Sequence, residues 1–299
     1  MNNSTIGNFE QVKLQKSPIF VSCYITFELL AMVLHGLLLY IVYRLHSIDN
    51  QYYLIRILSI ADSMTLVTTI LVTIEIPSKT VMIILLLATY ALYFWSLMIT
   101  IFLIVDRWLA VKYSLRYHAP VTKRKINISI LLSLFGGFII FSCLFFIEGV
   151  ESISNDHMYF TNRSTLAFLV ILRISTCVVI IVFGKSTIRL RNESEANRPP
   201  GANLHGVEAE RLDIIIKLKR SIKDVFKLNI WTCVFLLPLT FTTLTHLLFE
   251  EAPIQLFRLK FLLNLLYLVS NPIIYLTCFT RVRQFWYRRL FRRNDVNPE

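Results

Sequence analysis

Long apolar stretches separated by shorter polar segments make up most of the chain. Seven of these stretches reach the roughly 20 residues that a helix needs to cross a hydrocarbon core about 30 Å thick. They cover residues 18–43, 52–76, 81–109, 126–147, 166–183, 225–249 and 254–279. Because a chain in lipid must satisfy its backbone hydrogen bonds internally, each stretch is expected to be a helix. The pattern predicts an all-α membrane protein, a bundle of seven transmembrane helices over residues 18–279.

The segments outside these stretches are polar. Residues 1–17 are expected to form an N-terminal tail, and the charged, proline-containing residues 184–224 are expected to form a loop. Residues 280–299 interleave arginines with aromatic residues, which predicts a short amphipathic helix on the membrane surface, followed by a tail. No repeat relates the two halves of the chain, which disfavours a transporter built from inverted repeats.

Basic residues are concentrated on one side of the predicted bundle. Most of the 31 Lys and Arg residues lie in the segments after the first, third, fifth and seventh stretches. The positive-inside rule places these segments in the cytoplasm and the N-terminus outside. We therefore expect a multi-pass plasma-membrane protein whose net charge of +12 contacts anionic lipid head groups rather than nucleic acid. The sequons at Asn2, Asn3 and Asn162 then lie outside and are candidate glycosylation sites.

Composition agrees with lipid as the solvent, since 55% of the residues are hydrophobic, 17% are charged and the mean hydropathy is +0.59. A soluble domain carries about 25% charged residues. The 5 cysteines lie in or beside the apolar stretches and are expected to be packing residues. The 6 histidines are scattered, with neither an H-E-x-x-H motif nor a nucleophile elbow, so we expect no enzyme.

A few polar residues interrupt the apolar stretches, where an ionisable group costs at least about 2.5 kcal/mol. Asp62, Ser96 and Asn271 lie in the second, third and seventh stretches. Either they converge on a cation or a water cluster inside the bundle, or they are a chance set of satisfied interior polar residues. Pro238 and Pro272 lie inside the sixth and seventh stretches and are expected to bend those helices.

Three charged residues in the stretches leave two interpretations open. Asp106 and Arg107 close the third stretch on the inner side, where an arginine can simply snorkel to the head groups and pair with its neighbour. Arg173, in the fifth stretch, either attracts an anionic ligand or pairs with Glu28 or with backbone carbonyls.

In combination, these residues match the motifs of one receptor family. The motifs L-x-x-A-D, D-R-Y/W and N-P-x-x-Y are similar to Leu58-Ser59-Ile60-Ala61-Asp62, Asp106-Arg107-Trp108 and Asn271-Pro272-Ile273-Ile274-Tyr275. Residues 115–118 and 122–124 resemble the following inner loop of melanocortin-like members. Over nearly its whole length, the chain resembles the rhodopsin-like (class A) G-protein-coupled receptors, with residues 280–299 resembling their eighth helix.

The resemblance implies a role for each matching residue. An allosteric sodium ion is expected at Asp62, Ser96 and Asn271, and the partners are expected to be a heterotrimeric G protein, an extracellular ligand and membrane lipids. Residues implied to switch or couple to the G protein are Asp106, Arg107, Pro238, Asn271, Pro272 and Tyr275. Residues implied to line the ligand pocket are Thr89, Tyr90, Tyr93, Arg173, Leu236 and Asn264.

The chain also departs from the family pattern. Met82 stands where the family has a disulfide cysteine, and Leu236 replaces the tryptophan before the sixth-helix proline. Leu218 replaces an acid that often pairs with the third-helix arginine, which raises the hypothesis of high basal activity. Thr89 and Leu265 stand where amine receptors have Asp and opsins have Lys, which disfavours both ligands. A non-signalling relative and, less well supported, a channel or transporter remain as alternatives.

Overall fold

The structure, a computed structural model of the 299-residue chain, describes most of the predicted helices. The described residues are 18–45, 50–74, 78–113, 122–147, 163–196, 227, 230–245, 247–248, 254–279 and 282–285. The predictions made for Asn2, Asn3, Asn162 and Leu218, and for most of the segment 280–299, lie outside these residues. Residues 282–285 are helical, and Val282 packs into the core below the last long helix.

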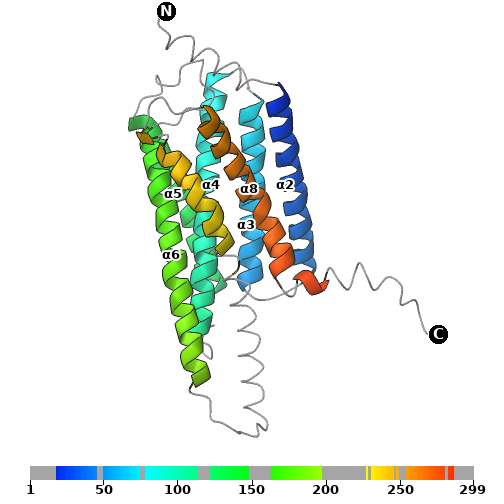
Figure 1. The fold of residues 1–299 in the computed structure, drawn as a ribbon, viewed down its shortest axis with the longest axis vertical. Coiled ribbons are helices and arrows are strands. Elements are labelled where there is room, and N and C mark those ends of the chain that lie inside the picture. The colour runs from blue at the N-terminus through cyan, green and yellow to red at the C-terminus, as the bar shows by residue number, and fades with distance from the viewer. Residues whose placement is uncertain are drawn as a thin grey trace, which may run out of the picture.

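The described residues form helices that lie side by side along one axis, and helices that follow each other in the chain run in opposite directions (Figure 1). We call the end where the first of them begins the upper end and the opposite end the lower end, as in Figure 1. The helices are α2 (Pro18–Arg44), α3 (Asn50–Thr73), α4 (Lys79–Lys112), α5 (Lys123–Ile147), α6 (Arg163–Ala196), the helix Ile230–Thr245, and α8 (Ile254–Cys278).

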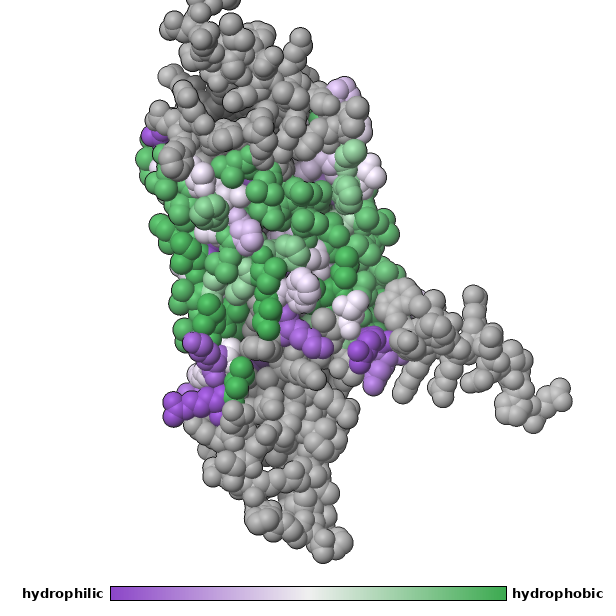
Figure 2. Space-filling view, in the orientation of Figure 1, coloured by the Kyte–Doolittle hydropathy of each residue, from purple (hydrophilic) through white to green (hydrophobic). Residues whose placement is uncertain are grey.

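The prediction of an all-helical membrane protein is confirmed for the described part of the chain. Five helices, α2 to α6, are long and apolar enough to cross a membrane, and two apolar helices, Ile230–Thr245 and Leu262–Thr277, are shorter. Large apolar side chains cover the outside of these helices, as the broad green belt in Figure 2 shows. Phe135, Ile139 and Phe146 on α5, for example, are 62%, 64% and 80% exposed. An apolar surface of this extent is stable in lipid and costly in water.

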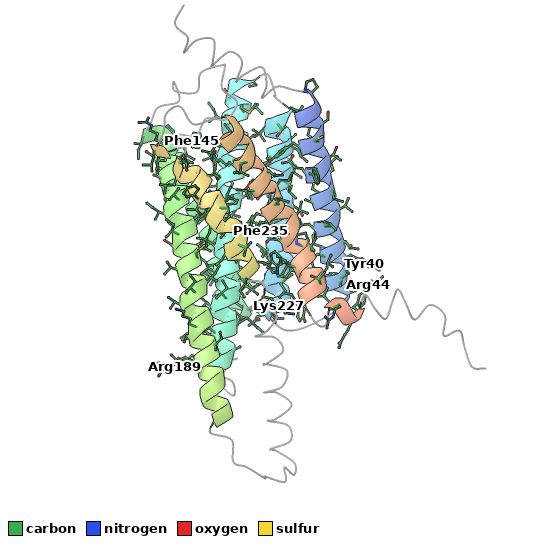
Figure 3. The ribbon with its side chains drawn as sticks, viewed as in Figure 1. Tyr40, Arg44, Phe145, Arg189, Lys227 and Phe235 are labelled. Atoms are coloured by element: carbon green, nitrogen blue, oxygen red, sulfur yellow. The ribbon has the colours of Figure 1, made fainter. Side chains whose placement is uncertain are left out.

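Exposed basic side chains gather at the lower end. Arg44, Arg189 and Lys227 all lie there, with Arg189 on the part of α6 that projects below the bundle (Figure 3). The guanidinium of Arg44 lies 5.6 Å from the ring centroid of Tyr40 on the same helix, a cation–π contact at the membrane edge. The charge distribution thus makes the lower end the side on which cytoplasmic lysines and arginines are expected.

One predicted boundary is wrong. We expected the helix to end near residue 183 and a loop to begin at residue 184, whereas α6 continues to Ala196. The part of this helix that is apolar enough to cross a membrane covers Arg163–Ser186, so the helix continues past the apolar part of its sequence. Charge alone is therefore a poor marker of where a membrane helix ends.

The core is built around α4, which packs against α3, α5 and α6, while α2 packs against α3 and α8. The approach of α5 to α4 is close at Gly137, where an added Cβ would lie 3.0 Å from Cδ1 of Phe94 and 3.2 Å from the carbonyl oxygen of Ala91. Trp95 of α4 donates a hydrogen bond of 3.1 Å from its indole nitrogen to the carbonyl of Ile130 on α5. Small residues and interhelical hydrogen bonds of this kind hold membrane helices together where lipid gives no hydrophobic driving force.

Candidate functional site

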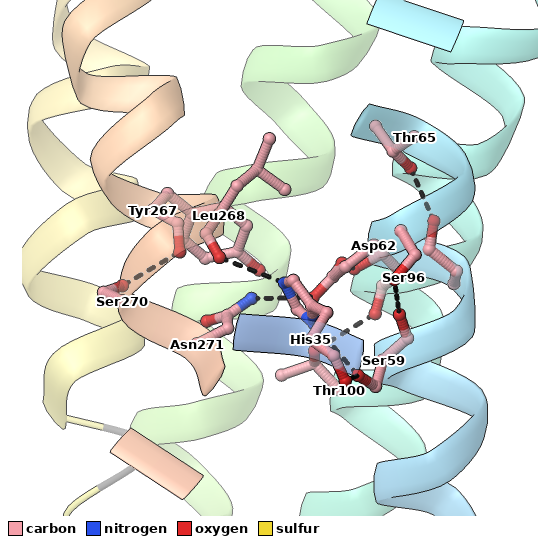
Figure 4. Close-up of polar contacts among 12 residues, drawn as sticks. His35, Ser59, Asp62, Thr65, Ser96, Thr100, Tyr267, Leu268, Ser270 and Asn271 are labelled. Carbon is pink, nitrogen blue, oxygen red and sulfur yellow. Dashed lines mark hydrogen bonds and ion pairs between the residues drawn. The ribbon is translucent and has the colours of Figure 1, made fainter. Parts of the chain in front are cut away.

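A cluster of buried polar side chains joins three helices in the middle of the bundle (Figure 4). Asp62 of α3 is fully buried, and Ser96 of α4 and Asn271 of α8 are 2% and 3% exposed. The Ser96 hydroxyl donates to Oδ1 of Asp62 at 2.5 Å, and the Asn271 amide nitrogen donates to Oδ2 at 3.1 Å. The three side chains therefore meet and satisfy one another, and binding of a cation or a water cluster by them stays a prediction.

His35 of α2 completes this cluster and was not predicted from the sequence. Its Nε2 lies 3.2 Å from the carbonyl oxygen of Leu268 and 3.8 Å from Oδ2 of Asp62, and its Nδ1 lies 3.0 Å from the Ser59 hydroxyl. Since a carbonyl can only accept, Nε2 carries a hydrogen. The Ser59 hydroxyl can donate either to Nδ1 or to the His35 carbonyl oxygen, which lies 3.2 Å away. When it donates to the carbonyl, it can accept a hydrogen bond from Nδ1. His35 thereby ties α2 to α3 and α8.

The spacing of the buried residues along α2 is the sequence signal from which the buried position of His35 could have been predicted. The buried residues of this helix recur at steps of three and four, which is the period of one helix face. This buried face consists of Tyr24, Glu28, Ala31, His35, Leu38 and Val42. A polar residue in phase with such a face points into the bundle, where it needs a partner.

The chemistry of the central cluster fits a small cation. A carboxylate, a hydroxyl and a side-chain amide are the oxygen-bearing groups that hard cations take as ligands, and α3, α4 and α8 bring one of each together. His35 borders the same carboxylate, so a positively charged imidazole would compete with a cation there. The implied sodium site at Asp62, Ser96 and Asn271 stays a prediction, and His35 is a neighbour of its carboxylate.

At the lower end, Arg107 is held by two buried acceptors. Its Nε donates to Oδ2 of Asp106 at 2.8 Å, and its Nη2 pairs with the same oxygen. Its Nη1 donates to Oε1 of Gln51, at the start of α3, at 2.9 Å. Arg107 is 9% exposed and Asp106 is 4% exposed. The ion pair is therefore buried in the bundle, and the guanidinium does not extend towards the head groups. Of the interpretation that Arg107 snorkels and pairs with its neighbour, the pairing with Asp106 is present, whereas the guanidinium itself is buried.

Gln51 is a second residue that the sequence analysis missed. It is 4% exposed although it lies in the first turn of α3, at an end of the bundle where polar side chains are normally solvated. A buried amide at a helix start needs a partner, and Gln51 contacts the guanidinium of Arg107. The sequence offered only its position, one residue before the apolar stretch.

Trp108, next to Arg107, connects α4 to α6. Its indole nitrogen donates to the Ser186 hydroxyl at 3.0 Å, and its ring packs edge-on against Phe183 with centroids 5.2 Å apart. The ammonium nitrogen of Lys112, four residues further along α4, lies 4.6 Å from the centroid of the Trp108 ring. Adjacent residues of α4 thus contact α3 on one side and α6 on the other.

In the upper half of the bundle, Arg173 of α6 is 4% exposed and binds two other helices. Its Nε donates to the Tyr93 hydroxyl of α4 at 3.0 Å, and its Nη1 donates to the Thr243 hydroxyl at 2.8 Å and the Leu239 carbonyl at 3.4 Å. Of the pairings expected for Arg173, a backbone carbonyl is present. Glu28 is not one of its described partners, and neither oxygen of its buried carboxylate has a hydrogen-bond partner among the described residues.

The other residues of the predicted ligand pocket differ in burial and in the helices that they contact. Leu236 is fully buried in the same apolar cluster as Tyr93. Tyr90 stacks on Phe141 of α5 with ring centroids 5.7 Å apart, and the Thr89 hydroxyl bonds a carbonyl of its own helix. Asn264 is half-buried on α8. The structure therefore joins Tyr93, Arg173 and Leu236 and leaves Thr89 and Asn264 apart from them.

The remaining switch residues lie on the helix Ile230–Thr245 and on α8. Tyr275 is 2% exposed and packs against Phe279, with ring centroids 5.2 Å apart. Pro272 is buried inside α8, directly after the Asn271 that bonds Asp62. Pro238 is exposed in the middle of the helix Ile230–Thr245. Both prolines lie inside helices, and the bend expected at each stays a prediction.

No protein-family model matches this chain, and no curated protein matches its sequence. The motifs and the contacts that they make are therefore what any assignment of function depends on.

Proposed function

We propose that this protein is a rhodopsin-like G-protein-coupled receptor of the plasma membrane, with seven membrane-spanning helices and its N-terminus outside. One observation carries the proposal. Asp62 accepts hydrogen bonds from Ser96 and Asn271, which lie 34 and 209 positions away in the sequence and on two other helices. The polar character of these three residues within apolar stretches, and the family resemblance, both group them, and their hydrogen bonds support the proposal.

In this proposal, the contacts of Arg107 define the resting state. Asp106 and Gln51 occupy its guanidinium, so it is not free to meet a partner protein from the cytoplasm. Activation breaks the Gln51 contact and turns Arg107 towards the G protein. The helix Ile230–Thr245 moves outward around Pro238, and Tyr275 moves into the space that opens. A switch of this type uses discrete alternative contacts rather than continuous bending.

Arg173 gives the upper end a connection to that movement. It bonds Tyr93 of α4 and Thr243 of the helix Ile230–Thr245, so its contacts fix how these helices sit against α6. A ligand that draws Arg173 away from Thr243 would loosen the helix that must move. Asp62, Ser96 and Asn271 would hold the sodium ion, which would supply positive charge beside a buried carboxylate in the resting state.

The proposal is tested by basal nucleotide exchange on purified heterotrimers of each G-protein class, with the full-length receptor in membranes. Wild type is expected to accelerate exchange on one class, and Arg107→Ala at equal surface expression is expected to abolish it. An Arg283→Ala variant, which changes an exposed arginine at the same end, serves as the control. Surface-expressed wild type without exchange on any class supports a non-signalling relative instead. Ion flux in liposomes that Arg107→Ala leaves unchanged supports a channel or transporter.

A further inference from the structure

Two arginines and two tyrosines meet on the outside of α2 and α3, near the lower end of the bundle. Tyr40, Tyr43 and Arg44 are exposed and share one face of α2, because residues three and four positions apart on a helix are neighbours. The guanidinium of Arg44 lies 5.6 Å from the ring centroid of Tyr40 (Figure 3). Arg56 reaches the same face from α3, since its guanidinium lies 5.6 Å from the Tyr43 centroid and its Nη2 donates to the Val42 carbonyl at 2.8 Å. We call Tyr40, Tyr43, Arg44 and Arg56 the α2–α3 arginine site.

Arg56 is only partly satisfied by the protein around it. Its Nη2 bonds the Val42 carbonyl, whereas its buried Nε has no hydrogen-bond partner among the described residues. No described acid forms an ion pair with it, and the only acids of α2 and α3, Glu28 and Asp62, are fully buried further up the bundle. Arg56 lies within a membrane-spanning helix, about 9 Å from its start. Hydrocarbon offers no counter-charge there, so an anion beside this arginine is favourable.

The surface of α3 above Arg56 is apolar. Ile60 and Met64 follow it at steps of four on the same face of the helix and are 43% and 48% exposed. An occupant that matches this surface has an anionic part at the arginines and an apolar part that continues into the bilayer. A phospholipid has this construction, because its phosphate oxygens accept from guanidinium groups while its acyl chains contact residues such as Ile60 and Met64. A free phosphate ion would match the arginines but not the apolar surface.

We infer that the α2–α3 arginine site binds the head group of an anionic phospholipid in the inner leaflet. The phosphate lies between Arg44 and Arg56, whose guanidinium groups are held by the rings of Tyr40 and Tyr43. A zwitterionic choline lipid binds less well, because its ammonium group is repelled by two nearby positive charges. The inference goes beyond the proposed function and uses only one part of it, the cytoplasmic position of the lower end, where anionic lipids are concentrated. A lipid bound there clamps α2 to α3, which already pack against each other.

Native mass spectrometry of the purified full-length protein in detergent tests the site by counting bound lipids. The probes are dioleoylphosphatidylserine, dioleoylphosphatidylcholine with the same chains, and glycerophosphoserine, the head group without chains. We expect one phosphatidylserine to bind more tightly than phosphatidylcholine, and glycerophosphoserine not to compete at equal concentration. Arg44→Gln and Arg56→Gln are each expected to weaken phosphatidylserine binding at least about fivefold. Arg124→Gln, which removes an exposed arginine at the lower start of α5, should leave it unchanged.

Three results would overturn the inference. They are equal binding of the two lipids by wild type, a preference for phosphatidylserine that survives the double variant Arg44→Gln/Arg56→Gln, and full competition by glycerophosphoserine. Because Arg44 is exposed, its variant keeps the test decisive even if Arg56→Gln does not fold. Binding in detergent does not depend on orientation or on a G protein. G-protein exchange without a preference for phosphatidylserine therefore contradicts the lipid site alone, and the preference without exchange contradicts the proposed function alone.

Discussion

The contact between Gln51 and Arg107 makes a quantitative prediction about basal signalling. Gln51→Leu removes the 2.9 Å hydrogen bond to Nη1 while keeping a side chain of similar size. A hydrogen bond to a charged group contributes about 1.5–3 kcal/mol. Arg107 keeps its hydrogen bonds to Asp106 and is 9% exposed, so water can replace part of the lost hydrogen bond. The lower end of this range, about 1.5 kcal/mol, therefore applies. About 1.4 kcal/mol corresponds to a tenfold change in an equilibrium constant.

The equilibrium constant between the resting and the active state should therefore shift about tenfold towards the active state. If the active conformation is populated at about 1% before the change, it rises to about 10%, and basal exchange per receptor rises with it. Gln51→Glu acts in the opposite direction, because a carboxylate in place of the amide oxygen strengthens the pairing with Arg107. The assay is nucleotide exchange on the coupled G protein without ligand, normalised to surface receptor.

Gln284→Leu is the matched control, since it makes the same exchange at an exposed position of the lower end. It should leave basal exchange unchanged. The reasoning is refuted if Gln51→Leu lowers basal exchange or leaves it as in wild type, or if the Leu and Glu variants change it in the same direction. Either result would mean that the Gln51 contact persists in the active state or is irrelevant to the switch.

Two further predictions concern the middle of the bundle. Replacing choline by sodium at constant ionic strength should raise the Tm of the purified protein, by the linkage of ligand binding to folding; Asp62→Asn should remove this effect and His35→Leu should enlarge it. A sodium effect that survives Asp62→Asn would contradict the predicted cation site. Gly137→Ala should unfold more readily than Gly136→Ala by about 1–3 kcal/mol, because both gain the same helix propensity but only the first places a Cβ 3.0 Å from Phe94. Equal stability of the two variants in a denaturation series would show that α4 and α5 are less closely packed than the structure has them.

The sequence was sufficient for the features that depend on one residue's own chemistry. Apolar length predicted the helices, and an acid in an apolar stretch marked Asp62 as a residue that needs partners. The contacts that join distant parts of the chain were harder to predict. Ser96 and Asn271 were grouped with Asp62 because they are polar residues inside apolar stretches. His35 and Gln51 were not, and they contact their partners because of how α2 and α3 are rotated in the bundle. Helix rotation is set by packing on all sides, which the pattern of a single helix under-determines.

The lower boundary of α6 shows a different limit. Hydropathy measures where a chain leaves lipid, and by that measure the helix crosses the membrane over Arg163–Ser186. Residues 187–196 are polar but remain helical, since backbone hydrogen bonding continues wherever the side chains favour a helix. The end of a membrane span and the end of a helix are separate events, and only the first leaves a clear mark in hydropathy.

That extension gives α6 the mechanics of a lever. At 1.5 Å per residue its 34 residues measure about 51 Å, of which roughly the last 15 Å stand clear of the membrane. A tilt of about 10° around the upper end of this helix would carry the tip sideways by about 9 Å, given that length. A displacement too small to notice inside the bundle thus becomes a large one where a cytoplasmic protein would meet it. Amplification of this sort requires only that the arm stay straight.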